Sequence, residues 1–349
     1  MSNMEANRAG DTSRRSGNSP ALSFSKDFAK PSRQVRVLLE DELLDRLGRR
    51  GFADAGTNQA RYLIRRIGFA HVESYLRAFS TKAVPSLRLV HQAILFDRRF
   101  QSILLKYIGL FELQFRAQYS QALAESGGAF AHRDGTNFKS PKHFSEFLGD
   151  YQRELNRQLN SGNGHVSRIV REYGELPVWD AVEVMSFGTL SKAYKNTRSK
   201  AVRFRVSDSF GVRYEALESW MQSIAFARNR CAHFGRLIGT TLAAPPRKLS
   251  GIALSNQHPF YLVLVLEKLL NTDAGFTDDT SLMYSLGLLR DVGNLISETP
   301  AEVTMEYMPP NWKSMMTARE VSGAAVELVM GPTAPPEVVF LPSLDGGRR

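Results

Sequence analysis

Cysteine is almost missing from this chain. Cys231 is the only one among 349 residues, which excludes a disulfide framework and any zinc site that needs several thiolates. A single thiol is typical of proteins in a reducing compartment, so we expect a cytoplasmic protein.

Long apolar runs are missing as well. The best candidate, residues 260–266, is much shorter than the roughly 20 apolar residues of a membrane-spanning helix, and Glu267 and Lys268 follow it. We therefore predict a buried helix there and no membrane partner. The N-terminal residues are basic and rich in serine but have no apolar core. That excludes a secretory signal and leaves an organellar transit peptide as the alternative to a plain tail.

The residue patterns of several enzyme classes are also absent. No phosphate-binding P-loop, glycine-rich dinucleotide loop or serine nucleophile elbow occurs in the sequence, which argues against the enzymes that depend on them. Apart from His233, the histidines include no pair four residues apart and no His-Glu-x-x-His frame, so we expect no metal site and no cofactor. They are His71, His91, His132, His143, His165 and His258.

Positive charge, by contrast, is in excess. Lys and Arg number 45 against 35 Asp and Glu, which gives a formal net charge of +10 at pH 7. Such a balance favours an anionic partner, with nucleic acid first and an acidic membrane surface second. Charge alone leaves open whether the protein contacts nucleic acid at all.

Helical periodicity dominates the chain from about residue 35 onward, and no alternating pattern predicts a pair of β-strands there. An amphipathic helix ends near Gly48 and Gly51, and Gly68 predicts a tight joint between two helices within 57–79. A longer helix starts after Ser86, a candidate N-cap, and extends to Gly127. Further helices are predicted after Ser140-Pro141 and after Pro177, with Gly188 separating the latter from a following basic helix. A strong helix is predicted over 214–233, and two or three more end near 308–310.

We therefore predict an all-α protein, a multi-helix bundle with three regions. Residues 1–32 hold too few large apolar side chains to offset the entropy lost on ordering, so they are predicted to form a disordered basic tail. Residues 33–318 are predicted to form one helical domain, because no linker inside them is long enough to separate two. Residues 319–349 are predicted to pack loosely, with 337–341 as a possible short extended piece.

One predicted helix end combines residue types that suit phosphodiester chemistry. Arg228, Asn229 and His233 lie near the end of the helix over 214–233. An imidazole exchanges protons near neutral pH, and a guanidinium binds phosphate while staying charged. At about 100° per residue, Arg228 is rotated roughly 140° from His233, whereas Asn229 shares a face with His233. The alternative is a chance spacing in which His233 is only a favourable cation at a helix C-terminus.

Five ordered segments resemble the Abi family of abortive-infection proteins (AbiD/AbiF-like), which belongs to the HEPN superfamily of helical ribonucleases. They are residues 67–79, residues 96–100 with Glu112, residues 177–194, residues 228–237 and residues 308–312. This chain departs from the family at two places. Phe69, Ala70 and His71 stand where the family usually has Tyr and Arg, and Phe234 stands where it often has a second histidine.

The resemblance implies a HEPN-like fold and a metal-independent endoribonuclease of an antiphage system, whose activity is restrained until infection. It implies that His233 acts as general acid and base, that Arg228 stabilises the transition state and that Asn229 orients the phosphate or the histidine. It also implies a homodimer in which two copies of the motif form one composite site. Glu112 is a possible support that pairs with Arg228, although a helix-capping role is the alternative.

A second basic segment is the candidate for RNA contact. It has no acidic residue and consists of Lys192, Lys195, Arg198, Lys200, Arg203 and Arg205. Such density supplies phosphate affinity without sequence readout, and the bland alternative is a solvated face. The rival functions are a catalytically inactive HEPN-like module that binds a structured or noncoding RNA, and a protein-interaction scaffold.

Overall fold

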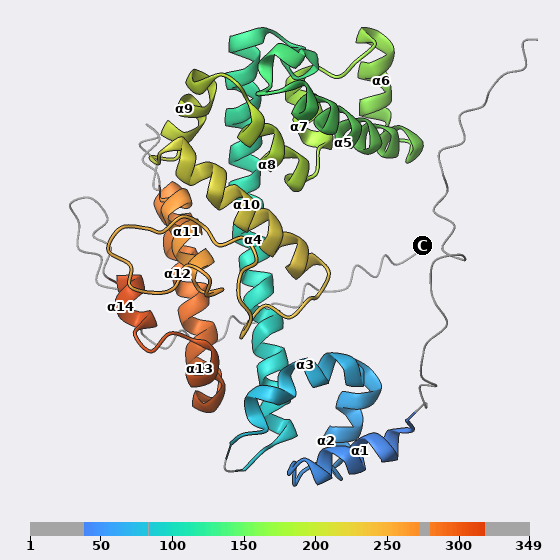
Figure 1. Ribbon diagram of the computed structural model, residues 1–349, viewed down its shortest axis with the longest axis vertical. Helices are drawn as coiled ribbons and strands as arrows, with labels where there is room; N and C mark the ends of the chain where they lie inside the picture. The colour runs from blue at the N-terminus through green and yellow to red at the C-terminus, as the bar shows by residue number, and fades with distance from the viewer. Residues whose placement is uncertain (1–37, 83, 272–279, 318–349) are drawn as a thin grey trace, which may run out of the picture.

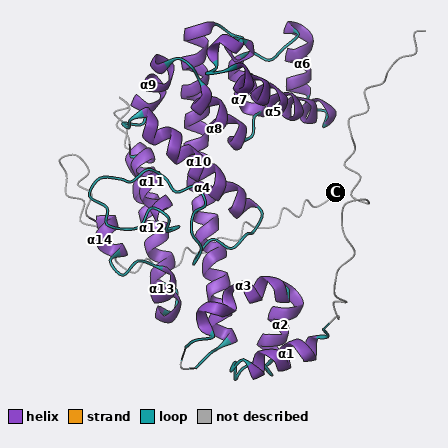
Figure 2. Ribbon diagram, viewed as in Figure 1, coloured by secondary structure: helices purple, strands orange, loops and turns teal. Residues whose placement is uncertain are grey.

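The computed structural model describes residues 38–82, 84–271 and 280–317. Over these ranges it contains helices and no β-strand, which confirms the predicted all-α class (Figure 2). The one extended pairing among the described residues is an isolated bridge between Phe138 and Thr197. The predicted tails, 1–32 and 319–349, lie outside the described residues, and so does the possible extended piece at 337–341.

Helix α4 is the axis of the molecule, and the other helices pack along it (Figure 1). At one end lie α1, α2 and α3. Helices α5 to α9 gather at the other end, and α10, α11 and α12 flank the middle. The bounds are α1 Glu40–Arg49, α2 Asn58–Tyr62, α3 Phe69–Phe79, α4 Leu87–Gly127, α5 Pro141–Asn160, α6 Gly164–Tyr173, α7 Val178–Val184, α8 Phe187–Asn196, α9 Lys200–Asp208, α10 Tyr214–Ala232, α11 Tyr261–Leu270, α12 Thr280–Ser297, α13 Ala301–Tyr307 and α14 Trp312–Thr317.

Helix α4 has 41 residues, which corresponds to about 60 Å of helix at 1.5 Å per residue. Its first turn is capped from a distant part of the chain. Asp54 accepts hydrogen bonds from the backbone N–H groups of Leu87 and Arg88 at 2.9 and 3.0 Å. The side chain of Ser86 makes no cap of its own and instead donates to Asp54 at 2.9 Å. The predicted cap position is therefore right, but the capping carboxylate is supplied by Asp54.

The joint at Gly68 is confirmed. Residues Leu63–Ile67 form a single π-helical turn, and the N–H of Gly68 donates to the carbonyl of Leu63 at 3.2 Å. Gly68 then takes φ 88°, a value that favours glycine, and α3 begins at Phe69. The joint turns α3 back against α4, so that His71 lies beside Arg98 in the N-terminal part of α4.

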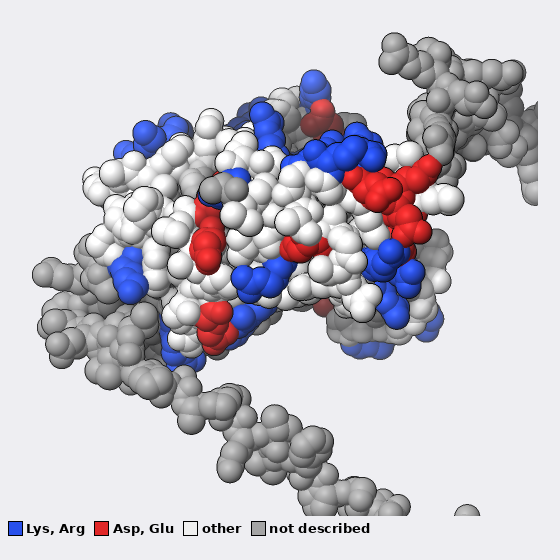
Figure 3. Space-filling view, turned by 90° about the horizontal axis from the view of Figure 1, so that it is seen from below, with Lys and Arg blue, Asp and Glu red and all other residues white. Residues whose placement is uncertain are grey.

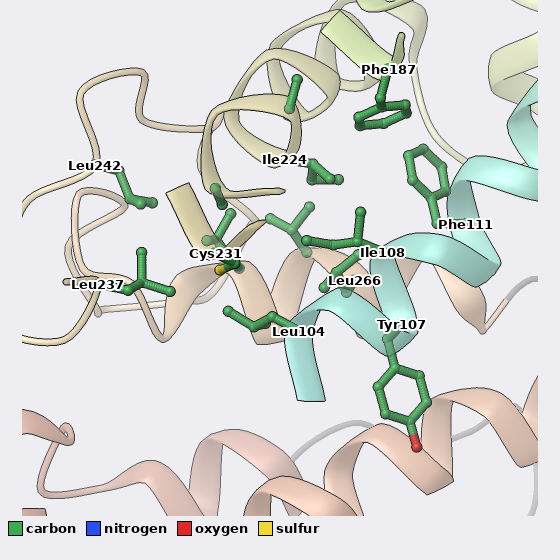
Figure 4. Packing of buried hydrophobic residues seen from close by; sticks show 14 of the residues in the cluster. Leu104, Tyr107, Ile108, Phe111, Phe187, Ile224, Cys231, Leu237, Leu242 and Leu266 are labelled. Carbon is green, nitrogen blue, oxygen red and sulfur yellow. The ribbon is translucent and has the colours of Figure 1, made fainter. Parts of the chain in front are cut away.

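A continuous apolar core surrounds the inner face of α4. Figure 4 shows side chains of α4, α10, α11 and the segment after α10 pointing toward one another around Leu104, Cys231 and Leu266. Cys231 is 2% exposed, and burial raises the pKa of its thiol to about 12. The thiol therefore stays protonated at neutral pH and belongs to the core. Tyr107 turns away from this cluster and donates to Asp291 on α12 at 2.8 Å.

Three boundaries differ from the predicted ones. Gly188 lies inside α8, because the chain breaks earlier, at Ser186, whose hydroxyl accepts from the N–H of Thr189 at 3.1 Å. The basic segment 192–205 is divided between two helices, since Ser199 caps a new helix, α9. At the C-terminal end the described residues hold α11 to α14, and α14 follows Pro310, beyond the predicted end.

The apolar run at 260–266 forms the start of α11, and the predicted burial is confirmed for every residue from Tyr261 to Leu266. Among the described residues, no helix is both long enough and apolar enough to cross a membrane.

Candidate active site at the end of helix α10

Helix α10 ends in a Schellman turn in which a phenylalanine takes the backbone conformation that glycine usually adopts. The N–H of Gly235 donates to the carbonyl of Arg230 at 2.8 Å, and the N–H of Phe234 donates to the carbonyl of Cys231 at 3.1 Å. His233 is the C-cap residue of the helix, with φ −97°. Phe234 occupies the left-handed position with φ 54°, where glycine is the usual residue.

The segment after this turn is anchored to α4 by one buried carboxylate. Asp97 is fully buried and accepts the backbone N–H groups of Leu237 and Ile238 at 3.0 and 3.3 Å. It also accepts the hydroxyl of Tyr75 at 2.6 Å. Burying a carboxylate is costly unless donors satisfy it. Three donors from α3 and the segment after α10 do so, and the position of the end of α10 follows from them.

Arg236 joins two of these elements, α3 and the segment after α10. Its guanidinium lies 4.9 Å from the centre of the Tyr75 ring, donates to the carbonyl of Ile238 at 2.9 Å and also bonds to the carbonyl of Ser74 on α3. These contacts use the guanidinium inside the protein, so Arg236 positions the turn.

The structure places the three predicted catalytic residues on the surface. Asn229 and His233 are exposed and Arg228 is half-buried. None of these side chains makes a hydrogen bond or ion pair with another described residue. Because α10 is helical up to Ala232, Arg228 keeps its rotation of roughly 140° from His233. One chain therefore presents the two groups in different directions.

A second pair of polar side chains, His71 and Arg98, meets at this helix end, and the sequence motif did not single it out. The guanidinium of Arg98 on α4 contacts Nε2 of His71 on α3 and donates to the side-chain oxygen of Gln101 at 2.9 Å. It also lies 5.2 Å from the centre of the Phe234 ring. Gln101 in turn donates to the carbonyl of Gly235 at 2.9 Å. The resemblance had marked the segments that contain these residues without giving Arg98 a role.

The protonation of His71 follows from these contacts. A guanidinium only donates, so Nε2 of His71 is the acceptor and carries no proton. Burial and the adjacent charge of Arg98 lower the pKa of the His71 imidazole below its usual value. At neutral pH this ring is therefore uncharged.

Positive charges outnumber negative ones at this end of α10. Arg98, Arg228, Arg230 and Arg236 form no ion pair with any described acidic residue, while the carboxylate of Asp97 is enclosed by backbone and tyrosine donors. The opposite holds near α1, where Arg61 pairs with Glu40 at 2.9 Å and with Asp41 at 2.6 Å. Figure 3, seen from below, shows basic and acidic groups side by side on that face.

The predicted RNA-contact residues are not one open patch. Arg203 is 6% exposed, pairs with Glu218 at 2.6 Å and lies 4.6 Å from the centre of the Tyr214 ring, so its guanidinium serves packing. Arg198 is exposed and forms no ion pair with a described residue, and its Nε–H donates to the carbonyl of Phe138 at 2.9 Å.

The other four cations of this segment are exposed. Lys192 pairs with Asp150 at 3.2 Å, and Arg205 pairs with Glu125. Of these four, only Lys195 and Lys200 form no ion pair with a described residue, so these two lysines, together with Arg198, are the cations of the segment that remain available to a phosphate.

The possible support from Glu112 is not formed. Its carboxylate pairs with Arg116, one turn along the same face of α4, instead of with Arg228. Arg116 also donates to the carbonyls of Met185, at 2.9 Å, and Val182, and so ties α4 to the end of α7. Glu112 therefore has a structural role: it pairs with the arginine that joins α4 to α7.

No group of His, Cys, Asp or Glu suited to a metal ion occurs in the described part of the chain. The arrangement is that of an all-helical protein with a basic, solvent-exposed cluster of residues at a helix end. Residues 62–239 match the family model of the Abi-like proteins, which is just over half of the 349 residues, and the chain belongs to this family. The matched range contains the joint, the whole of α4 and the whole of α10 with its terminal turn. No curated protein and no solved structure matches the chain.

Proposed function

We propose that the protein is a metal-independent endoribonuclease of the HEPN type that acts in antiphage abortive infection. Membership of the Abi-like family supports the defence role. The observation that carries the chemistry is the end of α10, where His233 is exposed and Arg228 makes no ion pair within the described chain. Groups that are free of internal partners are available to a substrate phosphate.

The proposed reaction uses the RNA's own 2′-hydroxyl as nucleophile. His233 takes the proton of the 2′-hydroxyl as the 2′-oxygen bonds to phosphorus, and the bond from phosphorus to the 5′-oxygen breaks. A proton returned from the protonated imidazole goes to the leaving 5′-oxygen, which leaves a 2′,3′-cyclic phosphate. Arg228 stabilises the negative charge that develops on the phosphate, and Asn229 orients it.

The angular separation of Arg228 and His233 supports a composite site. In the proposed homodimer the ends of two α10 helices face each other, so that Arg228 of one chain and His233 of the other approach the same phosphate. Each helix end carries exposed polar groups toward such a partner, and the shared substrate anion offsets the repulsion between the two basic ends.

The angular separation of Arg228 and His233 also favours a second candidate function. If two chains do not pair, the unbalanced arginines still bind RNA while His233 has no arginine beside it. The protein is then an RNA-binding module without cleavage.

Cleavage of labelled RNA in excess EDTA separates the two candidates, with DNA of the same sequence as substrate control. We expect RNA-specific cutting that leaves 2′,3′-cyclic phosphate ends and is lost in His233→Ala. The matched control is His165→Ala, because His165 is also exposed but pairs with Asp180 at 3.0 Å, outside the α10 site. Equal RNA binding by wild type and His233→Ala with no cutting by either would favour the binding module.

A further inference from the structure

We propose that Phe234 and Arg98 form a stacking platform for one unpaired nucleobase of the bound RNA, next to the phosphate held by His233 and Arg228. This inference rests on the proposed function in taking RNA as the ligand of the α10 end. It adds a specificity element that the Arg-polar-x-x-x-His motif does not contain.

The backbone of Phe234 is the first observation. It is the only non-glycine residue of the described chain with a positive φ, at 54°. A residue with a Cβ atom is destabilised in this left-handed conformation. The conformation nevertheless falls on Phe234 and not on the glycine that follows it, Gly235. Strain of this kind persists where the surroundings hold it, and it is concentrated at binding sites.

The exposure of the ring is the second observation. Phe234 is 68% exposed as a residue, so neither burial nor core packing explains a phenylalanine at this position. A strained backbone that presents an apolar ring to solvent costs stability twice. The ring is therefore placed for something that binds it.

The position of Arg98 is the third observation, and it selects the ligand. The guanidinium lies 5.2 Å from the ring centre and is held there by Gln101 and His71. It has no acidic partner among the described residues. A ring beside an unbalanced cation suits a base joined to a phosphate, because bases stack on aromatic faces while the cation attracts the backbone.

In a neighbouring groove, by contrast, the other charged side chains are paired within the protein. Arg98 also lines a groove of about 480 Å³ between α4 and α12. There Arg99 pairs with Glu298, and Asp291 pairs with Lys106 at 2.8 Å. These charges are neutralised within the protein, so Arg98, whose guanidinium lies 5.2 Å from the centre of the Phe234 ring, is the one charged residue lining this groove that has no ion-pair partner among the described residues.

The test is the affinity of single-stranded RNA that carries one abasic nucleotide, scanned along the strand, for His233→Ala protein that cannot cut it. A stacked base contributes about 1–3 kcal/mol, so we expect one position where the abasic nucleotide weakens binding about fivefold to a hundredfold. In the same background Phe234→Leu should abolish this position dependence and Phe234→Tyr should keep it. Arg98→Gln should lower the salt dependence of binding, which Phe234→Leu should leave unchanged.

Phe234→Gly separates lost stacking from misfolding, because glycine adopts φ 54° freely and preserves the turn. It should bind like Phe234→Leu and melt no lower than wild type. The platform is overturned if the abasic scan gives the same profile with and without the Phe234→Leu substitution. It is also overturned if Phe234→Leu changes only the monomer–dimer equilibrium in sedimentation velocity, since the ring is then a contact with a second copy.

The outcomes for the two proposals are distinct. Cleavage without an abasic position effect removes the platform and leaves the ribonuclease intact. An abasic position effect without cleavage by wild type retains the platform on an RNA-binding module. Absence of any salt-dependent RNA binding removes both.

Discussion

Asp97 and Leu237 are joined by a buried hydrogen bond of 3.0 Å across 140 positions of the sequence. This contact, with those to Ile238 and Tyr75, fixes the end of α10 against α4 and α3. The proposed catalytic residues lie on one side of that anchor, and their positions depend on it. The anchor can be tested separately from the chemistry.

Asp97→Ala is expected to lower the free energy of unfolding by about 3 kcal/mol or more, because it leaves three buried donors without an acceptor. Urea denaturation followed by circular dichroism measures this loss. Asp45→Ala, on the exposed face of α1, is the control and should change stability by less than about 0.5 kcal/mol. A similar small effect for Asp97→Ala would contradict the anchoring role.

Phe234→Gly is expected to raise the free energy of unfolding by about 0.5–1 kcal/mol. Relief of the positive φ gains about 1–2 kcal/mol, and the lost contact with Arg98 and the greater freedom of the unfolded chain offset part of it. Phe234→Ala is the matched control: it removes the ring but keeps the Cβ, so it should show no gain. Equal effects of the two substitutions would mean that φ 54° carries no strain.

Stability should fall in mild acid because of His132. This side chain is 1% exposed, and neither ring nitrogen has a hydrogen-bond partner. Burial lowers the pKa of His132 to about 4, with Glu175 opposing and Arg133 reinforcing the shift. Between about pH 6.5 and pH 4 the unfolded state therefore binds more protons than the folded state, and stability declines as the pH falls, by about 1.4 kcal/mol per unit from this group.

Urea denaturation from pH 4.5 to pH 7.5, in wild type and His132→Phe, isolates this contribution. Phenylalanine keeps a ring against Tyr151, whose centre lies 5.3 Å from that of His132. The difference between the two proteins should change steadily as the pH falls below about 6.5 and should be constant near pH 7, where His132 is uncharged in both states. Parallel curves would show that His132 is protonated as easily in the folded state as in the unfolded one.

Complementation tests the composite site. Arg228→Ala and His233→Ala proteins should each be inactive, whereas a mixture that exchanges subunits should regain part of the activity, because one hybrid dimer contains an intact Arg228 and an intact His233 from different chains. The measurement is the rate of RNA cleavage against mixing ratio. A mixture as inactive as its components would mean that both groups must come from one chain.

Lys195 and Lys200 should contribute to RNA affinity, and Arg203 should not. Changing both lysines to Ala should reduce the slope of log affinity against log salt by up to about 0.7 per lost phosphate contact with single-stranded RNA. Arg203→Ala should instead destabilise the fold, because it leaves Glu218 without its partner at 2.6 Å. An unchanged salt slope in the double lysine variant would remove this segment from the RNA-contacting surface.

The sequence by itself determined the helical class and most helix boundaries. Helix periodicity, the Gly68 joint, the Ser140-Pro141 start of α5 and the extent of α10 are local properties that neighbouring residues specify. The resemblance of several ordered segments also predicted the family, and the match over residues 62–239 confirms it. It named Arg228, Asn229 and His233 as catalytic residues, and their role stays a prediction.

Only the tertiary structure decided which side chains meet. Asp54 caps α4 from 33 positions away, Glu112 pairs with Arg116 and not with Arg228, and Arg203 is buried. The contact between His71 and Arg98 exists because the joint folds α3 back onto α4, and Phe234 reaches Arg98 because Asp97 holds the segment after α10. Such partnerships depend on how helices pack, since spacing along one helix fixes only which residues share a face and leaves the opposing helix unspecified.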